Sequence, residues 1–397
     1  MSVCIFSLQT LFVHNSILAK EATIRIPFRY VQSFIIIDVQ IENVIPLQLI
    51  FDTGAEHTIL FEKYWTDIIS NAYQRDIKVI GSDLQTEIPA KLTHPLSLNF
   101  PLRYKCLTQL IVLEDHSTNI SQVIGEPVHG ILSASLFSQF IIQIDYKKRN
   151  IILHPLSTKV PEGFTELDIQ IYKNKPYLET EVATKWGQKQ KLNLLLDTGA
   201  SLSLLMYTDS TSNIDLPDKM IPGYLGSGLG GMLKGFVGKV GLIYLDTFTL
   251  SNVISHFLMV DTEYSRIEKQ NKQGLIGNLM LEKFELYIDY HRKKLFLKPT
   301  KKLYKEIKFD KSGMLIISGG NHLQNYYVSQ VIPNSPAYEA GILPKDELVS
   351  INGWPCSWLS LSKILSSFQK EEGKKINLKL RRNGKKIKIS FNLKSLI

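Results

Sequence analysis

The 397-residue sequence has few of the residues that bind metals or form disulfides. Its three cysteines, Cys4, Cys106 and Cys356, are far apart and lack metal-binding spacing, so we expect neither a disulfide framework nor a zinc site. The sequence also lacks a histidine pair at metal-ligand spacing and a Gly-x-Ser-x-Gly turn, which mark metal-dependent and serine-dependent hydrolases. We therefore expect a protein that needs no metal and no cofactor.

Beyond the N-terminus the sequence has no run of about 20 apolar residues, so we expect no transmembrane segment. Residues 3–13 are mostly apolar and residues 17–19 end in a small residue, as in a secretory signal, but the basic start of such signals is missing. Two interpretations of residues 1–22 stay open, an export signal or leader and a first strand. The first predicts an exported protein, periplasmic or secreted, and the second a cytoplasmic one.

The chain carries a formal net charge of +9, and 44% of its residues are hydrophobic. This hydrophobic content is enough for folded cores, and the length suggests two or three domains. The positive charges fall mostly in short turns and near the C-terminus, without interleaved aromatic residues. We interpret them as solvated hairpin edges and expect no nucleic-acid partner.

One four-residue motif occurs twice in the chain. Asp52-Thr53-Gly54-Ala55 returns as Asp197-Thr198-Gly199-Ala200, 197 − 52 = 145 residues later. A hydrophobic run typical of a β-strand precedes each copy, at residues 46–51 and 191–196. Each aspartate therefore lies where a buried strand meets a glycine turn, which is a costly place for a carboxylate without a partner or a shifted pKa.

Further landmarks repeat downstream of the motif at nearly the same offset. Gly130 and Gly274 each open a Gly-apolar-apolar segment, 274 − 130 = 144 residues apart, and Ile-Asp-Tyr recurs at 144–146 and 288–290. Between these landmarks lie short amphipathic segments that we expect to be helical. The repetition predicts two copies of one mostly β lobe, related by a pseudo-twofold axis.

The second copy contains a glycine-rich stretch at residues 223–231. Such glycine density lowers the cost of unusual backbone conformations and of motion. The stretch lacks the Lys-Ser/Thr ending of a phosphate-binding loop. A mobile hairpin over a cleft and a glycine-tolerant surface loop both stay open. The first interpretation makes Tyr224, Gly226 and Gly228 candidates for substrate contact, and it places the equivalent hairpin of the first copy near residues 77–88.

Two aspartates on apposed turns have a definite chemistry. Carboxylates about 3 Å apart cannot both ionise cheaply, so they share one proton and titrate as a pair. The ionised member can take a proton from a water held between them while the protonated member polarises a carbonyl oxygen, which is general acid–base hydrolysis of an amide. The hydroxyl groups of Thr53 and Thr198 can hydrogen-bond across the interface, and Gly54 and Gly199 allow a backbone N–H to approach each carboxylate.

The paired Asp-Thr-Gly-Ala motif, with a hydrophobic-hydrophobic-Gly element after each copy, resembles the aspartic proteases over roughly residues 30–300. The lobe length and the closing Ile-Asp-Tyr strand are most similar to retropepsin-like bacterial aspartyl proteases, with both motifs in one chain. The resemblance implies an aspartic endopeptidase that cleaves peptides or unfolded proteins, with Asp52 and Asp197 as its catalytic pair. The alternative is a catalytically inactive, protease-like scaffold that grips peptides.

The end of the chain resembles a PDZ domain of the bacterial protease-associated kind. The residues that carry this resemblance are Ser335-Pro336-Ala337, Ala340-Gly341, Asp346 and Ile351-Asn352-Gly353. It implies binding of peptide or protein C-termini, with the peptide added as a strand. The candidates for the loop that holds the terminal carboxylate are Gly313, Met314, Leu315 and Ile316.

We therefore expect a mainly β protein with two pseudo-twofold-related, acid-protease-like lobes and a small α+β PDZ domain. The expected boundaries are a leader at 1–22, the first lobe at 23–158, the second at 159–299, a linker at 300–309 and the PDZ domain at 310–397.

Two departures from the repeat fall in the first lobe. Ser133 stands where the second lobe has Gly277, so we expect a less regular turn there. Glu56 and His57 directly follow the first motif, and such groups either shift the proton affinity of the aspartate pair or point to solvent.

Overall fold

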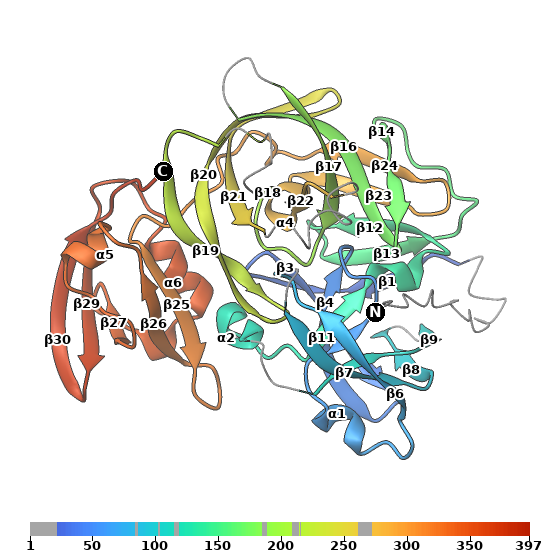
Figure 1. Cartoon of the computed structure of the whole chain (residues 1–397), viewed down its shortest axis with the longest axis horizontal. Coiled ribbons are helices and arrows are strands. Elements are labelled where there is room, and N and C mark those ends of the chain that lie inside the picture. The colour runs from blue at the N-terminus through green and yellow to red at the C-terminus, as the bar shows by residue number, and fades with distance from the viewer. Residues whose placement is uncertain are drawn as a thin grey trace, which may run out of the picture.

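The computed structural model describes residues 22–83, 86–101, 104–114, 119–184, 189–208, 214, 216–260 and 272–397. The predicted leader lies, up to residue 21, outside the described residues. The described part consists mainly of β-strands, arranged as two lobes and a C-terminal domain (Figure 1). Of the helices in this part, none is long and apolar enough to span a bilayer.

The first lobe is built on a sheet with the strand order β6-β7-β10-β5-β11-β4-β3-β8-β9, and β2 pairs with β3. Its strands are amphipathic or fully buried, as expected for a sheet with cores on both faces. The elements are β1 (Ile24–Pro27), β2 (Arg29–Val31), β3 (Phe34–Ile41), β4 (Ile45–Asp52), β5 (Ile59–Leu60), α1 (Tyr64–Asp67), β6 (Tyr73–Ile80), β7 (Glu87–Thr93), β8 (Leu96–Asn99), β9 (Lys105–Thr108), β10 (Ile111–Leu113), α2 (Ile120–Ile124), β11 (Gly130–Ser133), the 3-10 helix η3 (Ala134–Phe137), β12 (Ile141–Asp145) and β13 (Asn150–His154).

The second lobe has a sheet with the order β15-β16-β17-β22-β18-β21-β20-β19. Its central order, β20-β21-β18-β22-β17-β16, matches β7-β10-β5-β11-β4-β3 of the first lobe strand for strand. The elements are β14 (Thr165–Asp168), β15 (Gln170–Tyr172), β16 (Lys175–Ala183), β17 (Gln190–Asp197), β18 (Leu204–Thr208), β19 (Met220–Gly228), β20 (Gly231–Leu245), β21 (Phe248–Met259), β22 (Gly274–Gly277), α4 (Asn278–Leu281), β23 (Phe284–Asp289) and β24 (Lys294–Pro299). The predicted repeat of one β lobe is confirmed.

A six-stranded sheet joins the two lobes, in the order β1-β13-β12-β23-β24-β14. The repeated Ile-Asp-Tyr strands meet at its centre, where β12 and β23 run antiparallel with Ile142 opposite Ile288. Both isoleucines belong to one continuous core that extends through both lobes. The lobes are therefore fixed relative to each other by backbone hydrogen bonds and by a shared core.

The C-terminal domain has a core of its own. Its sheet has the order β25-β26-β27-β29-β30, with β28 paired to β27. The last hairpin turns at Asn383 and Gly384, both with positive φ, as the Asn-Gly pair predicts. The elements are β25 (Met314–Gly319), β26 (Asn325–Val331), α5 (Pro336–Glu339), β27 (Glu347–Ile351), β28 (Trp354–Pro355), the 3-10 helix η4 (Cys356–Trp358), α6 (Leu361–Ser367), β29 (Lys375–Arg382) and β30 (Lys385–Asn392).

Candidate active site

The two predicted aspartates end equivalent strands. Asp52 is the last residue of β4 and lies opposite Ser133 of the parallel strand β11. Asp197 is the last residue of β17 and lies opposite Gly277 of β22. Because β4 and β17 occupy the same place in their sheets, the two turns that follow them face each other across the pseudo-twofold axis.

The threonines of the motif lock these turns together. The Thr53 N–H donates to Thr198 Oγ1 at 3.1 Å, and the Thr198 N–H donates to Thr53 Oγ1 at 3.0 Å. Each hydroxyl in turn donates to a carbonyl of the opposite lobe, Thr53 to Leu196 O at 2.6 Å and Thr198 to Phe51 O at 2.9 Å. Both threonines are buried, so these four bonds are shielded from water and hold the aspartates in one arrangement.

The glycines allow the carboxylates to come together. A Cβ on Gly54 would lie 2.7 Å from Asp197 Cγ, and a Cβ on Gly199 would lie 2.3 Å from Asp52 Oδ2. Any side chain at either position would therefore push the opposite carboxylate away. The backbone N–H groups of both glycines also stabilise the carboxylates. Gly54 N–H donates to Asp52 Oδ1 at 2.6 Å, and Gly199 N–H donates to Asp197 Oδ1 at 2.9 Å.

The two aspartates, called the dyad below, do not have equal proton affinities. Burial and the neighbouring Asp197 carboxylate hold the pKa of Asp52 well above its usual range, and the Gly54 N–H offsets part of this shift. Burial also raises the pKa of Asp197, but the positive charge of Lys272 and a hydrogen bond with Asp52 work against it. This asymmetry favours a proton on Asp52 and a negative charge on Asp197, within a pair that titrates as a unit.

Lys272 is a site residue that sequence analysis missed. Its Nζ lies 5.2 Å from the centre of the Tyr207 ring. Burial alone would lower the pKa of Lys272, but the Tyr207 hydroxyl and the Asp197 carboxylate outweigh burial and the net shift is upward. Lys272 therefore stays charged, and its positive charge acts on the Asp197 carboxylate. It precedes the Gly274 landmark, and nothing in the local sequence distinguishes it from a surface lysine.

Two hairpins, one from each lobe, meet at their tips. The first hairpin is β6 with β7 and the second is β19 with β20, so the prediction of a first-lobe hairpin near residues 77–88 is confirmed. The Ser82 N–H donates to Leu229 O at 2.8 Å, and the Leu229 N–H donates to Ser82 Oγ at 3.0 Å. Leu229 is buried with first-lobe residues such as Ile88. We call this contact between Ser82 and Leu229 the clasp.

The predicted substrate-contact residues lie on the second hairpin. Tyr224 belongs to β19 at an irregularity in its pairing with β20, and its side chain lies outside the described residues. Gly226 has a φ of +131°, a conformation that other residues rarely adopt. Gly228 lies against the clasp, where an added Cβ would be 2.4 Å from Ser82 Cβ. Glycine is therefore required on structural grounds at both positions, and their contact with substrate stays a prediction.

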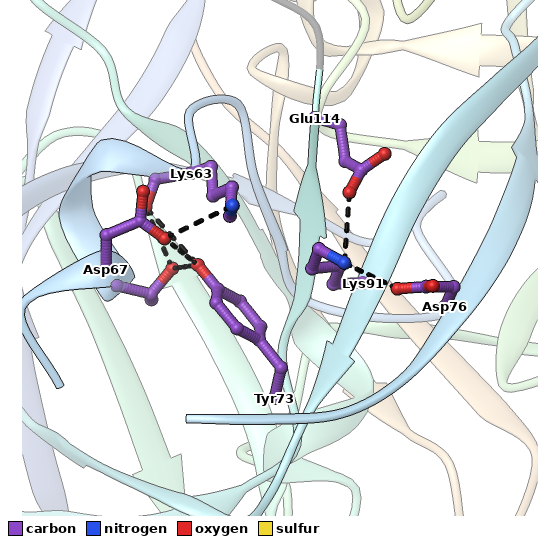
Figure 2. A network of polar contacts seen from close by, with 7 residues as sticks. Lys63, Asp67, Tyr73, Asp76, Lys91 and Glu114 are labelled. Carbon is purple, nitrogen blue, oxygen red and sulfur yellow. Dashed lines mark hydrogen bonds and ion pairs between the residues drawn. The ribbon is translucent and has the colours of Figure 1, made fainter. Parts of the chain in front are cut away.

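The first hairpin is fixed at its base by polar contacts (Figure 2). Lys91 of β7 pairs with Asp76 of β6 at 2.5 Å and with Glu114 at 3.1 Å. The Tyr73 hydroxyl donates to Asp67 Oδ1 of α1 at 2.8 Å. These contacts connect the first hairpin to α1 and to the segment after β10, so its base is attached at several points.

The departures in the first lobe disturb the site little. Ser133 keeps the strand register opposite Asp52, and its hydroxyl donates to Ala55 O at 2.7 Å. The turn is therefore closed by an added hydrogen bond, which differs from the less regular turn that we expected. Glu56 and His57 form a partly exposed pair at 3.6 Å, and burial lowers the pKa of His57.

The predicted carboxylate loop of the C-terminal domain already holds a carboxylate of this chain. The N–H groups of Ser312 and Gly313 donate to Asp310 Oδ1 at 2.9 and 2.7 Å, and the Met314 N–H donates to Ser312 Oγ at 3.1 Å. Burial raises the pKa of Asp310 to about 6 despite these donors. In this conformation the amides of Gly313 and Met314 are engaged, so binding of a peptide carboxylate by Gly313, Met314, Leu315 and Ile316 stays a prediction.

The described residues contain no group of three or more His, Cys, Asp or Glu side chains placed to hold a metal ion. A cavity of about 570 Å³ lies on the first lobe between Gln40, Gln48 and Phe100, and the dyad does not line it. The candidate site is the dyad, where two buried carboxylates are held by the threonines and glycines of both motifs.

Comparisons with known proteins bear mainly on the C-terminal domain. A family model for the PDZ domain matches residues 327–382. No match is found among curated proteins. Among solved structures, basic 7S globulin from soybean is similar with a TM-score of 0.42 and 9% identity, covering 70% of this chain and 95% of that one. An aspartic proteinase from Irpex lacteus is similar with a TM-score of 0.43 and 11% identity, covering 72% and 99%.

The family match confirms a PDZ domain at the C-terminus. Together with the two repeated lobes it confirms the predicted mainly β fold class. The matched segment begins after the predicted carboxylate loop, which it therefore does not include. The finer assignment to retropepsin-like proteases stays a prediction.

Proposed function

We propose that this protein is an aspartic endopeptidase whose dyad, Asp52 and Asp197, activates a water to hydrolyse a peptide bond. The observation that carries the proposal is the reciprocal bonding of Thr53 and Thr198, which brings two buried carboxylates face to face. A turn with a purely structural role does not need two such groups, because an apposed pair of carboxylates destabilises the fold unless it shares a proton.

The unequal environments of the dyad assign the two roles. Asp197, whose negative charge Lys272 favours, takes the proton from the water. Asp52, whose pKa is held well above its usual range, donates a hydrogen bond to the substrate carbonyl and then its proton. The water attacks the carbonyl carbon to give a tetrahedral intermediate, and proton transfer to the leaving nitrogen releases the two products.

The substrate is a peptide or an unfolded protein, and the PDZ domain binds a peptide or protein C-terminus. An extended substrate fits between the dyad and the two hairpins, because strand-like backbone can pair with hairpin edges. The clasp must open for such a chain to enter. The alternative, an inactive peptide-binding scaffold, has the same PDZ domain but makes no use of the proton shared by the dyad.

Cleavage of an unstructured protein such as casein, assayed from acid to neutral pH, tests the proposal. Asp52→Asn and Asp197→Asn should each lower turnover at least roughly 10³-fold, and the double variant should be no worse, because the pair acts as a unit. Circular dichroism should show that both variants stay folded. Equal cleavage by wild type and variants, or cleavage by none of them, would favour the scaffold.

A further inference from the structure

The PDZ domain contacts both lobes, and the two contacts differ in kind. Its C-terminal residue, Ile397, is buried in a cluster of the second lobe that includes Leu195 and Tyr207. Lys239 Nζ also donates to Ile397 O at 3.5 Å. This contact attaches the end of the chain to the face of the second-lobe sheet that carries Leu195 and Tyr207.

The contact with the first lobe involves a surface that PDZ ligands need. Strand β25 lies at one edge of the PDZ sheet and packs against α6. An extended peptide binds a PDZ domain by adding a strand at such an edge. We call β25 together with Leu361 and Ser362, the first residues of α6, the PDZ edge.

The short helix α2 of the first lobe occupies this edge. Ser318 of β25, which is 1% exposed, donates from Oγ to Gln122 O of α2 at 2.7 Å. Gly125 ends α2 with a φ of +81°, and a Cβ there would lie 2.9 Å from Leu361 Cβ. Gln32 Nε2 adds a hydrogen bond to Ser362 Oγ at 3.1 Å. Figure 1 shows α2 between the PDZ domain and the body of the first lobe.

The opposite side of α2 supports the second hairpin. Ile120 and Ile124 of α2 are buried in the same cluster as Leu229, the tip residue of the clasp. Strand β19 of the second hairpin also packs against α2. The five-residue helix α2 therefore contacts both the PDZ edge and the second hairpin.

We propose that the PDZ edge is a docking site for the chain's own α2, and that this docking holds the second hairpin closed over the dyad. A peptide ligand that pairs along β25 gains main-chain hydrogen bonds that a helix cannot supply, so it competes with α2 for the edge. Displaced α2 no longer supports Leu229, and the clasp opens. The consequence for turnover rests on the proposed function; the coupling between the PDZ edge and the hairpin does not.

Gly125→Val in the full chain tests the docking from the side of the lobe. The added side chain collides with Leu361, so α2 should leave the PDZ edge. Gly163→Val is the matched control, because Gly163 has a similar φ of +86° and its nearest neighbour would be Lys298 Nζ at 4.0 Å. Both variants carry the same backbone strain, and only the first disturbs the PDZ edge.

Hydrogen exchange in an Asp197→Asn background provides a readout that does not depend on activity. Amides of residues 119–125, and of residues 220–231 in the second hairpin, should exchange about fivefold or more faster in Gly125→Val and stay unchanged in Gly163→Val. Without the background change, Gly125→Val should cleave casein faster than wild type. If no form cleaves casein, the exchange result still decides the coupling.

Ser318→Lys tests the same contact from the PDZ side, with Ser318→Ala as its control of similar size. The lysine should separate α2 from β25 and reproduce the faster exchange of residues 220–231, whereas the alanine, which loses only the hydrogen bond to Gln122 O, should give a smaller increase. Faster exchange of α2 without any change in the second hairpin, in both Gly125→Val and Ser318→Lys, would overturn the coupling. Unchanged exchange of α2 itself would overturn the docking.

Discussion

The two lobes have the same motif and strand order, yet they close the turn after the aspartate differently. In the first lobe the Ser133 hydroxyl donates to Ala55 O. In the second, the equivalent carbonyl of Ala200 accepts from the Asn278 N–H at 2.8 Å, and a Cβ on Gly277 would lie 2.2 Å from Leu202 O. The alanine carbonyl accepts a hydrogen bond in both lobes, and the strand register is the same. Only the residue that donates the hydrogen bond differs.

The two hairpins also differ, in where each is attached to the rest of the protein. The first hairpin is short and is attached at its base through Lys91 and Tyr73. The second hairpin is long and rich in glycine, and its tip reaches the first lobe, where Leu229 is buried. One hairpin is therefore fixed at its base and the other is supported at its tip, which makes the second the better candidate for the moving part of a cleft.

Exchanging the residues at the two equivalent turn positions, Ser133 and Gly277, should reveal the largest difference between the lobes, in the free energy of unfolding. Gly277→Ser should lower the free energy of unfolding by about 3 kcal/mol, because the added atoms collide with Leu202 O. Ser133→Gly should cost only about 1–2 kcal/mol, for one hydrogen bond and for glycine flexibility. Chemical denaturation measures both. Similar losses in the two variants would show that the turns are equivalent after all.

Removal of the positive charge of Lys272 should give an intermediate effect, seen in the pH dependence of cleavage. A positive charge favours the ionised carboxylate, so Lys272→Met should raise the pKa of Asp197 and move the acid limb of the cleavage profile to higher pH. The measurement is casein cleavage against pH. Lys191→Met, at a surface lysine that pairs with Glu179 at 2.5 Å, should leave the profile in place. An acid limb that moves to lower pH in Lys272→Met would contradict the assignment of Asp197 as the base.

Loss of the network at the base of the first hairpin should give the smallest effect. Lys91→Met removes two ion pairs with exposed partners, so it should lower the free energy of unfolding only slightly. Hydrogen exchange should become a few times faster in residues 73–80 and 87–93 and stay the same in the second hairpin. An equal change in both hairpins would show that the clasp couples them more strongly than their separate attachments.

The local elements and the pairing of the lobes could be predicted from the sequence. The alternation of apolar residues predicted the strands before Asp52 and Asp197, and the constant offset of the landmarks predicted the repeat. The Asn383-Gly384 pair predicted the last hairpin. These features depend on neighbouring residues or on internal repetition, and both are visible in a sequence.

The rest of the site depends on contacts between segments far apart in the chain. Lys272 acts on Asp197 through space, Ser82 meets Leu229 across 147 residues, and Ser318 meets Gln122 across 196. No local pattern marks these residues, because Lys272, Ser82, Ser318 and Gln122 are ordinary surface types and Leu229 is a single leucine between glycines. The predicted loop at Gly313 illustrates the converse, since the sequence could not reveal that Asp310 already occupies its amides.

The sequence by itself determined that two aspartates end two copies of one strand, because strand periodicity and the Asp-Thr-Gly-Ala repeat are visible in short stretches of sequence. Only the tertiary structure decided that each carboxylate lies against the glycine of the opposite lobe and that Lys272 lowers the pKa of Asp197. It also decided that α2 lies between the PDZ edge and the second hairpin. The physical reason is that proton affinity and docking depend on burial and on distances through space, which are fixed only when the whole chain is packed.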